Sequence, residues 1–354
     1  MFVRVLLTGL LATAACGRFG FDEHDPSGTA PDASIGFDEV PLETWTWVDV
    51  PGMVCGNGSP TGIEVNLSRR SNKVLLLLEG GGACWEAAAC YGVIIPVAAE
   101  HLDGFDGNTF ENVRGPLDTN WAMQRGDSTS VFGDSSWIFV PYCTGDFHSG
   151  THVATYDVLG PRLMHHVGAN NIDAMLARIR MLPASEVFAV GISSGGYGVQ
   201  TNLDRIAATF PAAVTHVLAD GAPLVSFEPV RWSTMKTQWE PRFPAGCAGC
   251  AGGFSDVSRW WKDNLPSPSS RHGLLASLQD QGITLFSGND TSAVLGATQA
   301  LASSMQGQQA AFLIDTTTHT LLGLPETKTS TQVSVRTWVD AWATGAPGFK
   351  TVGP

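Results

Sequence analysis

Residues 187–203 read VFAVGISSGGYGVQTNL, and this stretch decides the fold. Its first four residues are apolar and partly β-branched, which is typical of a short buried strand, and the residues after Gly196 can continue as a helix. The pattern Gly-x-Ser-x-Gly therefore lies at a strand-to-helix turn, the context of a nucleophile elbow. Side chains two residues away from Ser193 would clash in such a turn, so Gly191 and Gly195 flank it. We expect the Ser193 hydroxyl to stand exposed at the carboxyl edge of a sheet.

The remaining chain alternates between strand and helix patterns. Residues 45–50 and 61–67 predict two antiparallel strands, and the unbroken apolar run 73–78 indicates a strand buried on both faces. Further strands are expected at 136–140, 213–219, 283–286 and 310–314, with helices at 170–181, 291–305 and 333–343. Residues 86–134 predict surface loops with short helices, and residues 224–281 form a Trp-rich insertion. This order predicts a mainly parallel α/β sheet with helices on both faces.

The amino terminus has the pattern of an export signal. Residues 1–15 contain an arginine, an apolar run and small residues, and are too short to span a membrane as a mature helix. Because Cys16 follows the small residues, the pattern resembles a lipobox, and we expect Cys16 to carry lipid; the alternative is an ordinary cleaved signal. Acidic residues with Pro, Gly and Ser predict a flexible tether over 16–44, followed by one domain over 45–354.

These features predict an exported bacterial protein, either an outer-membrane lipoprotein or a secreted one. It would meet the membrane only through its N-terminal lipid, and we expect a monomer. The formal net charge is −13, and nearly half of it comes from the tether. No basic patch suggests nucleic acid as a partner.

Six cysteines remain after Cys16, an even number that favours three disulfides in an oxidising compartment. They are Cys55, Cys84, Cys90, Cys143, Cys247 and Cys250. The last two form a CxxC pair, but neither a second CxxC nor a paired His motif follows to complete a zinc site. We therefore expect a structural bridge there, and neither a metal nor a cofactor.

Residues 79–85, EGGGACW, follow the strand at 73–78. Glycines at the carboxyl end of a strand let backbone N–H groups approach a developing negative charge, as in an oxyanion loop. A phosphate loop is disfavoured because neither Gly-Lys-Ser/Thr nor GxGxxG is present. We expect an oxyanion hole formed by the N–H of Ser194 and an N–H from Gly81, Gly82 or Ala83.

A serine nucleophile needs a base, and the base needs an acid that orients it. With the chain order Ser, acid, His, the histidine must follow Ser193. His216 lies inside a predicted strand and His272 begins a predicted helix, whereas His319 follows a strand near the carboxyl end. We therefore expect His319 as the base.

Two acids compete for the third position. Asp220 ends the strand after the elbow, and Asp290 follows the next predicted strand. We favour Asp290, because it comes nearer to the histidine in strand order and Asp220 with Gly221 can simply make a turn.

Four blocks together resemble the pectin acetylesterase family, which includes the animal carboxylesterase Notum. They are LEGGGACW at 78–85, PYCTGDFHSG at 141–150, GISSGG at 191–196 and HTLL at 319–322. The resemblance covers residues 45–345 and implies an α/β-hydrolase fold and metal-free ester hydrolysis by Ser193, Asp290 and His319. It also implies the disulfides Cys55–Cys143 and Cys84–Cys90, which leaves Cys247–Cys250. Gly82 stands where plant and animal members have an aromatic residue, which alters the pocket wall.

Two classes of function follow from these residues. The first is an exported serine carboxylesterase that removes short acyl groups, acetyl above all, from a polysaccharide or glycoside; long-chain lipid esters are the alternative substrates. The second is a lipid-tethered, non-catalytic glycan-binding protein. The Trp-rich insertion motivates the glycan, because indole rings can stack on sugars, although they can equally form core.

Overall fold

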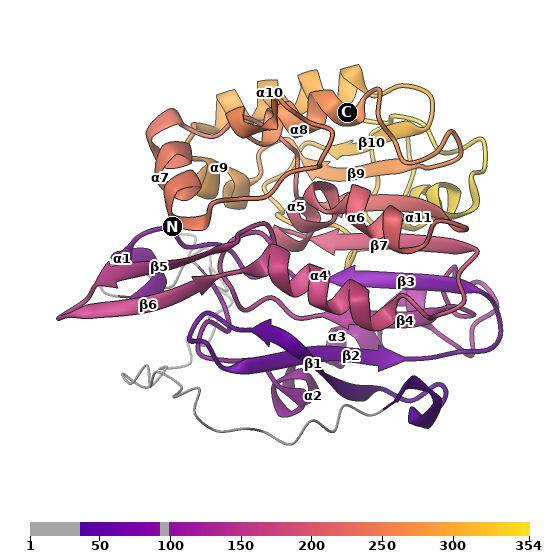
Figure 1. Ribbon diagram of the computed structural model, residues 1–354. Helices are drawn as coiled ribbons and strands as arrows, with labels where there is room; N and C mark the ends of the chain where they lie inside the picture. The colour runs from indigo at the N-terminus through magenta and orange to yellow at the C-terminus, as the bar shows by residue number, and fades with distance from the viewer. Residues whose placement is uncertain (1–35, 93–98) are drawn as a thin grey trace, which may run out of the picture.

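The computed structural model describes residues 36–92 and 99–354. An eight-stranded sheet lies at its centre, in the order β1-β2-β4-β3-β7-β8-β9-β10 (Figure 1). β1 (Thr46–Val54) pairs antiparallel with β2 (Pro60–Asn66), and β2 pairs antiparallel with β4. The other neighbours are parallel: β3 (Lys73–Leu78), β4 (Ser136–Val140), β7 (Glu186–Ile192), β8 (Val214–Asp220), β9 (His272–Ser277) and β10 (Gln309–Ile314). The predicted mainly parallel α/β sheet is confirmed.

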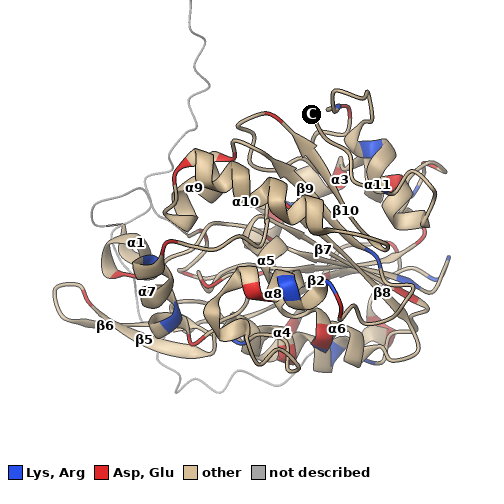
Figure 2. Cartoon of the chain, turned by 90° about the horizontal axis from the view of Figure 1, so that it is seen from above, with Lys and Arg blue, Asp and Glu red and all other residues tan. Residues whose placement is uncertain are grey.

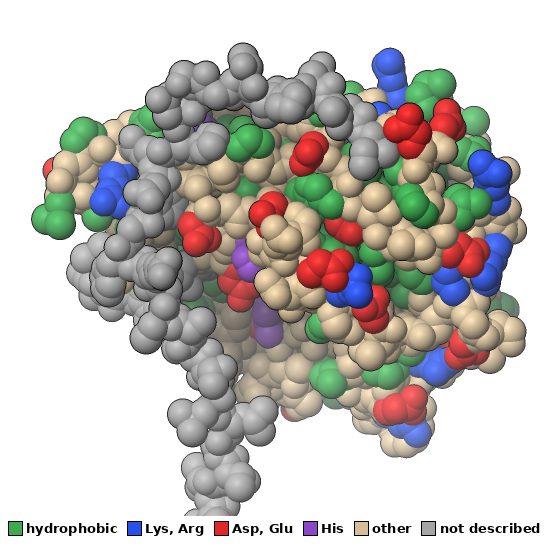
Figure 3. All heavy atoms as spheres, turned by 90° about the horizontal axis from the view of Figure 1, so that it is seen from below, with side chains coloured by type: hydrophobic (Ala, Val, Ile, Leu, Met, Phe, Trp, Pro, Cys, Tyr) green, Lys and Arg blue, Asp and Glu red, His purple; other side chains and the backbone are tan. Residues whose placement is uncertain are grey.

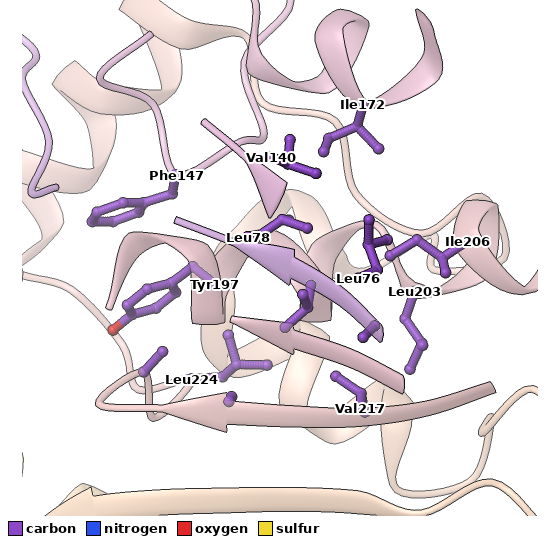
Figure 4. Close-up of a cluster of buried hydrophobic side chains, with 14 of the residues drawn as sticks. Leu76, Leu78, Val140, Phe147, Ile172, Tyr197, Leu203, Ile206, Val217 and Leu224 are labelled. Atoms are coloured by element: carbon purple, nitrogen blue, oxygen red, sulfur yellow. The ribbon is translucent and has the colours of Figure 1, made fainter. Parts of the chain in front are cut away.

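Helices cover both faces of this sheet, as expected. On β3, Val74, Leu76 and Leu78 face one core and Leu75 and Leu77 face the other, because successive strand side chains point to opposite faces. The first core packs against α4 (Gly168–Ile179), α5 (Ser194–Thr201), α6 (Leu203–Thr209), α8 (Phe254–Trp261) and α10 (Thr291–Ser304), part of which Figure 4 shows. The second packs against α2 (Gly107–Val113), η2 (Trp121–Met123) and α11 (Val335–Thr344).

Further elements gather at the end of the sheet toward which the parallel strands point (Figure 1). They are α1 (Ala87–Tyr91), α7 (Pro229–Trp239), α9 (Gln281–Ser287) and the antiparallel ribbon of β5 (His152–Asp157) and β6 (Pro161–His166). Three short elements lie elsewhere: η1 (Phe37–Glu39), α3 (Gly115–Asp118) and η3 (Cys250–Gly252). The carboxyl ends of the parallel strands thus lie under a cap of short elements.

The region from β9 to α9 differs from the prediction. Residues 283–286 were expected as a strand but lie in α9, whereas β9 falls inside the expected insertion, and His272 begins this strand rather than a helix. The apolar run 283–286 is too short for its periodicity to separate strand from helix. Asp280 favours the helix over the strand here, because its side chain accepts the N–H of Ile283 and so caps the first turn of α9.

Three of the four tryptophans of the insertion belong to the core. Trp239 and Trp261 are fully buried and Trp232 is 8% exposed. The indole N–H of Trp239 donates to the carbonyl oxygen of Cys84, and that of Trp261 donates to the carbonyl oxygen of Gln200. The sequence left open whether these indoles stack on sugars or pack in the core, and for these three the structure shows core packing.

The folded part of the chain begins earlier than the expected boundary at residue 45. Val40 is buried, the guanidinium of Arg178 lies 4.5 Å from the ring centre of Phe37, and Glu43 pairs with Arg70 at 2.6 Å. Within residues 36–44, which were assigned to the tether, Phe37, Val40 and Glu43 therefore contact the domain. The expected signal peptide (1–15), Cys16 and the rest of the tether lie outside the described residues.

The structure contains the disulfides Cys55–Cys143, Cys84–Cys90 and Cys247–Cys250, the same pairs that the resemblance implied. Along the ribbon of Figure 2 and on the face shown in Figure 3, Lys and Arg residues lie scattered among Asp and Glu. Within residues 36–92 and 99–354, no helix has the length and apolar character needed to cross a membrane.

Candidate active site

Ser193 lies at a sharp turn between β7 and α5, as the sequence predicts. Its φ of 54° and ψ of −121° form a strained conformation that a residue with a side chain rarely adopts. The flanking glycines permit this turn: a Cβ on Gly191 would overlap the carbonyl of Gly195, and one on Gly195 would overlap the carbonyl oxygen of Leu78. The serine is consequently presented at the carboxyl end of the central strand.

His319 lies beside this serine, on the loop that follows β10. Its Nε2 is 2.7 Å from Ser193 Oγ, and its Nδ1 is 2.9 Å from both carboxylate oxygens of Asp280. Burial by itself lowers the pKa of His319, but the hydrogen bond and charge of Asp280, with the charge of Asp220, raise it above its ordinary value. A hydroxyl, an imidazole and a buried carboxylate in this chain of contacts form the arrangement of a serine hydrolase.

The carboxylate in this arrangement comes from Asp280, which the sequence reasoning did not consider. Asp280 is 1% exposed, follows β9 and caps α9. It was missed because the strand was placed at 283–286. The signal was the buried run of β9, since the acid of this fold follows a strand end and Asp280 is the first acid after that run.

Asp290 does not occupy the position expected of it. It is exposed at the start of α10, where its side chain accepts the N–H of Ala293 at 2.8 Å and the hydroxyl of Ser292 at 2.6 Å. These bonds lower the pKa of Asp290. Asp290 therefore caps α10, and its hydrogen-bond partners are residues of that helix and not His319.

Asp220, the other candidate, is fully buried but does not bond the imidazole. Its carboxylate accepts the N–H groups of Leu321 and Leu322, and its carbonyl oxygen accepts the N–H of Ser193 at 2.7 Å.

The other two histidines after the elbow are buried in strands: His216 lies near Glu186 at 3.3 Å, and His272 lies 3.0 Å from Gln200.

The glycine-rich loop lies against the elbow. A Cβ on Gly80 would come within 2.9 Å of Ser193 Cβ, and Gly81 and Gly82 have φ values of 148° and 77°. Among the described residues, none accepts a hydrogen bond from the N–H of Gly81, Gly82 or Ser194. These are the N–H groups expected to form the oxyanion hole.

Buried contacts fix this loop from behind. Glu79 accepts the N–H of Tyr142 at 2.9 Å with its side chain, and its carbonyl oxygen accepts the Nε2–H of His148 at 2.9 Å. Burial raises the pKa of Glu79 to about 8 and lowers that of His148 to about 4. Cys84 is held by its disulfide and by a bond from its N–H to Gly145. The sequence showed Glu79, Tyr142 and His148 within two blocks of resemblance but gave these three residues no role, whereas the disulfide of Cys84 was expected.

Aromatic side chains pack behind the elbow. The rings of Tyr197 and Phe147 stack on each other, as Figure 4 shows. Their centres are 4.6 Å apart, and Phe227 and Phe254 complete the cluster. All four side chains are at most 8% exposed. Nearer the surface, the half-buried Trp85 packs edge to face on Phe286, with 6.5 Å between the ring centres. The guanidinium carbon of Arg231 lies 4.9 Å from the centre of the Trp85 ring.

One group of side chains among the described residues has the spacing of metal ligands. The ligand atoms of Cys84, Cys90 and His166 lie within 4.8 Å of one another. Both sulfurs are used in a disulfide, and the two nitrogens of His166 contact Thr144 O and Tyr156 Oη. These residues as they stand therefore do not fit a metal ion.

The strand order, the elbow and the contacts of Ser193, His319 and Asp280 define an α/β-hydrolase with the geometry of a serine hydrolase. The sequence model of the family described as pectinacetylesterase matches residues 39–231, more than half of the chain. The chain belongs to the pectinacetylesterase family, a family of carboxylic-ester hydrolases, as the resemblance predicted.

Curated relatives carry the name palmitoleoyl-protein carboxylesterase. Notum2 of Xenopus laevis is 27% identical over 166 residues, which cover 44% of this chain and 30% of notum2. NOTUM of Schmidtea mediterranea is 26% identical over 247 residues, covering 62% and 44% of the two chains. The chain thus spans less than half the length of these relatives. The solved structure of the Wnt deacylase Notum from Drosophila superposes with a TM-score of 0.60 at 16% identity, over 88% of this chain and 95% of that one, which confirms the fold.

Proposed function

We propose that this chain is a serine carboxylesterase that works through an acyl-enzyme on Ser193. The observation that carries the proposal is the unbroken chain of contacts from Ser193 Oγ through His319 to the buried Asp280. His319 Nε2 takes the hydroxyl proton as Oγ attacks the ester carbonyl, and Asp280 holds the imidazole in the required tautomer. The N–H groups of Gly81, Gly82 and Ser194 bind the oxyanion.

The intermediate then resolves in two stages. The proton on His319 passes to the alcohol oxygen as the ester C–O bond breaks, which leaves the acyl group on Oγ. A water molecule gives its proton to His319 and attacks the acyl carbon, and the carboxylic acid leaves as Oγ regains the proton. No metal is needed in this sequence.

For the substrate we propose a short acyl ester, acetyl above all, on a polysaccharide or glycoside. The closely packed, buried cluster of Phe147, Tyr197, Phe227 and Phe254 supports a short acyl group over a chain that reaches into the core. Since three of the four insertion tryptophans are core and the fourth, Trp260, is partly buried against it, the glycan rests on the family. A long-chain acyl ester is the competing proposal, favoured by the names of the Notum relatives.

We propose that the protein is exported and held at a membrane by lipid on Cys16. Three disulfides among the described residues support an oxidising compartment. Replacing Cys16 with serine tests the anchor: the wild type should partition into detergent and the variant should not. An equal soluble fraction for both proteins would leave only secretion.

Turnover of p-nitrophenyl esters tests the activity. Ser193→Ala should lower kcat by about 10⁴-fold or more and abolish labelling by a fluorophosphonate. Ser303→Ala, on the exposed side of α10, is the matched control and should keep both. Full turnover by Ser193→Ala would refute the proposal.

The same assay tests the acyl group of the substrate. The acetate or butyrate ester should give the highest kcat/KM, and a maximum at about eight carbons or more would favour the long-chain substrate.

A further inference from the structure

Asp220 connects the two halves of the candidate site. It is the last residue of β8, its carbonyl oxygen accepts the N–H of Ser193 at 2.7 Å, and its side chain reaches the loop that carries His319. The N–H of Leu321 lies 2.9 Å from both carboxylate oxygens, and the N–H of Leu322 lies 2.7 Å from Oδ2. One fully buried residue therefore holds the backbone on both sides of the Ser193–His319 contact.

We propose that Asp220 is a positioning residue: its ionised carboxylate holds the His319 loop in register with the Ser193 elbow. The inference rests on the proposed serine mechanism. It assigns to Asp220 a role different from that of Asp280, because Asp220 bonds the backbone that follows the histidine and not the imidazole.

Hydrogen bonds hold this loop on both sides of the histidine: Asp315 and Thr316 bond Gln279 before it, and Asp220 holds the backbone after it. Residues 315–317 are exposed, and the His319 side chain is itself 32% exposed. On its inner side, a Cβ on Gly221 would overlap the carbonyl oxygen of His319, so the turn after Asp220 packs directly on the histidine backbone. Leu322 is additionally tied by its carbonyl oxygen to the indole N–H of Trp121 at 3.2 Å.

The charge of Asp220 gives the role a signature in pH. The charged groups that act on Asp220 are His319, on the loop after β10, and Asp280, after β9. Burial raises the pKa of Asp220 to about 7, although the N–H groups of Leu322 and Leu321 oppose this shift by favouring the carboxylate. The charge of Asp220 in turn raises the pKa of His319.

Two groups must therefore lose a proton to form the active state. Asp220 accepts the loop N–H groups with both carboxylate oxygens, and protonation would turn one of these oxygens into a donor. His319 must be neutral to accept the serine proton. Below both pKa values, log kcat/KM should rise with pH at a slope approaching 2, because the two titrations are coupled and both are required. A residue that only fills space would leave the slope at 1.

The test compares the wild type with Asp220→Asn, which keeps the shape and removes the charge. We expect kcat to fall by about 10²-fold, as for a catalytic group misplaced by about 1 Å, with KM within about threefold of the wild type. The acid limb of the variant should have a slope of 1 and lie at lower pH, because His319 loses a neighbouring negative charge. Asp290→Asn is the control, since Asn also caps helices well, and it should match the wild type in kcat and slope.

The outcomes separate this inference from the proposed function. If wild-type turnover is lost in Ser193→Ala while Asp220→Asn keeps wild-type kcat and slope, the positioning role is refuted and the serine mechanism stands. If the wild type turns over no ester, the proposed function fails first. The acid-limb slope of the wild type needs no variant, so it remains decisive if Asp220→Asn does not fold: a slope of 2 supports the role, and a slope of 1 at pH values where the protein stays folded overturns it.

Discussion

Asp280 Oδ1 accepts a hydrogen bond from His319 Nδ1 at 2.9 Å, and the same oxygen accepts the N–H of Ile283 at 2.9 Å. The first bond orients the imidazole, and the second starts α9. The carboxylate is therefore held by the end of β9 on one side and by the first turn of α9 on the other. Its direction is fixed by secondary structure before any substrate binds.

Asp280→Asn should lower kcat by about 10⁴-fold while the protein remains folded. The amide keeps the shape of the side chain, but it favours the wrong tautomer of His319 and cannot stabilise the imidazolium. Steady-state kinetics on an aryl ester measures the loss, and circular dichroism checks the fold. Asp290→Asn, made in parallel, should retain activity because Asp290 only caps α10. The reverse result would restore Asp290 as the catalytic acid.

Gly282→Ala should lower kcat by about 10²-fold through His319. Gly282 is the second residue of α9, and a Cβ there would lie 2.7 Å from His319 Nδ1 and 2.9 Å from Cε1, so the ring must shift from its place between Asp280 and Ser193. The matched control is Gly296→Ala in α10, where a Cβ meets nothing within 4 Å. The control should keep activity and gain about 0.5–1 kcal/mol of stability. Equal kinetics for the two variants would show that α9 does not position the histidine.

The prediction from sequence succeeded where one local pattern determined the structure. The elbow around Ser193 combines a buried strand with obligatory glycines, so both its position and its conformation followed from the residue types. The buried run at 73–78 also fixed the strand that leads to the glycine loop. His319 followed in turn, because it is the histidine after the elbow that lies on a loop behind a strand.

The acid could not be found in the same way, because it depended on a strand boundary. The run at 272–277 and the run at 283–286 are both short and apolar, and only packing in the sheet separates them. The β5–β6 ribbon was also missed. Its two strands pair only with each other, outside the main sheet. The positioning role of Asp220 was also hidden, since backbone N–H groups of a distant loop leave no pattern in the sequence.

Activity should fall as the pH drops through the raised pKa of His319. Below that pKa the imidazole is protonated and cannot accept the proton of Ser193, so kcat/KM decreases toward acid. Because Asp280 raises this pKa by its hydrogen bond and charge, the acid limb of Asp280→Asn should move to lower pH as its rate falls. The residual turnover measured with a fluorogenic ester gives the midpoint. A midpoint that stays in place would show that Asp280 does not bond His319 in solution.

Glu64→Gln should stabilise the protein at neutral and alkaline pH. Glu64 lies in β2, is 2% exposed, and its Oε2 has no hydrogen-bond partner among the described residues. Burial raises its pKa to about 8, and the charge of Glu111 adds to this shift while that of Arg114 opposes it. The folded protein therefore keeps a proton that the unfolded chain releases, so the stability contributed by Glu64 is present below its ordinary pKa and is lost as the pH rises through about 8.

Gln cannot ionise, so the difference in Tm between Glu64→Gln and the wild type should widen by about 3 °C or more as the pH rises from about 5 to about 9. Calorimetry at several pH values measures this difference, and Glu326→Gln, at an exposed position, controls for the loss of a surface charge. The slope with pH is more informative than the difference at any one pH, because the packing of the buried amide contributes equally at all of them. A difference that does not change with pH would mean that Glu64 reaches solvent and ionises freely in the folded protein.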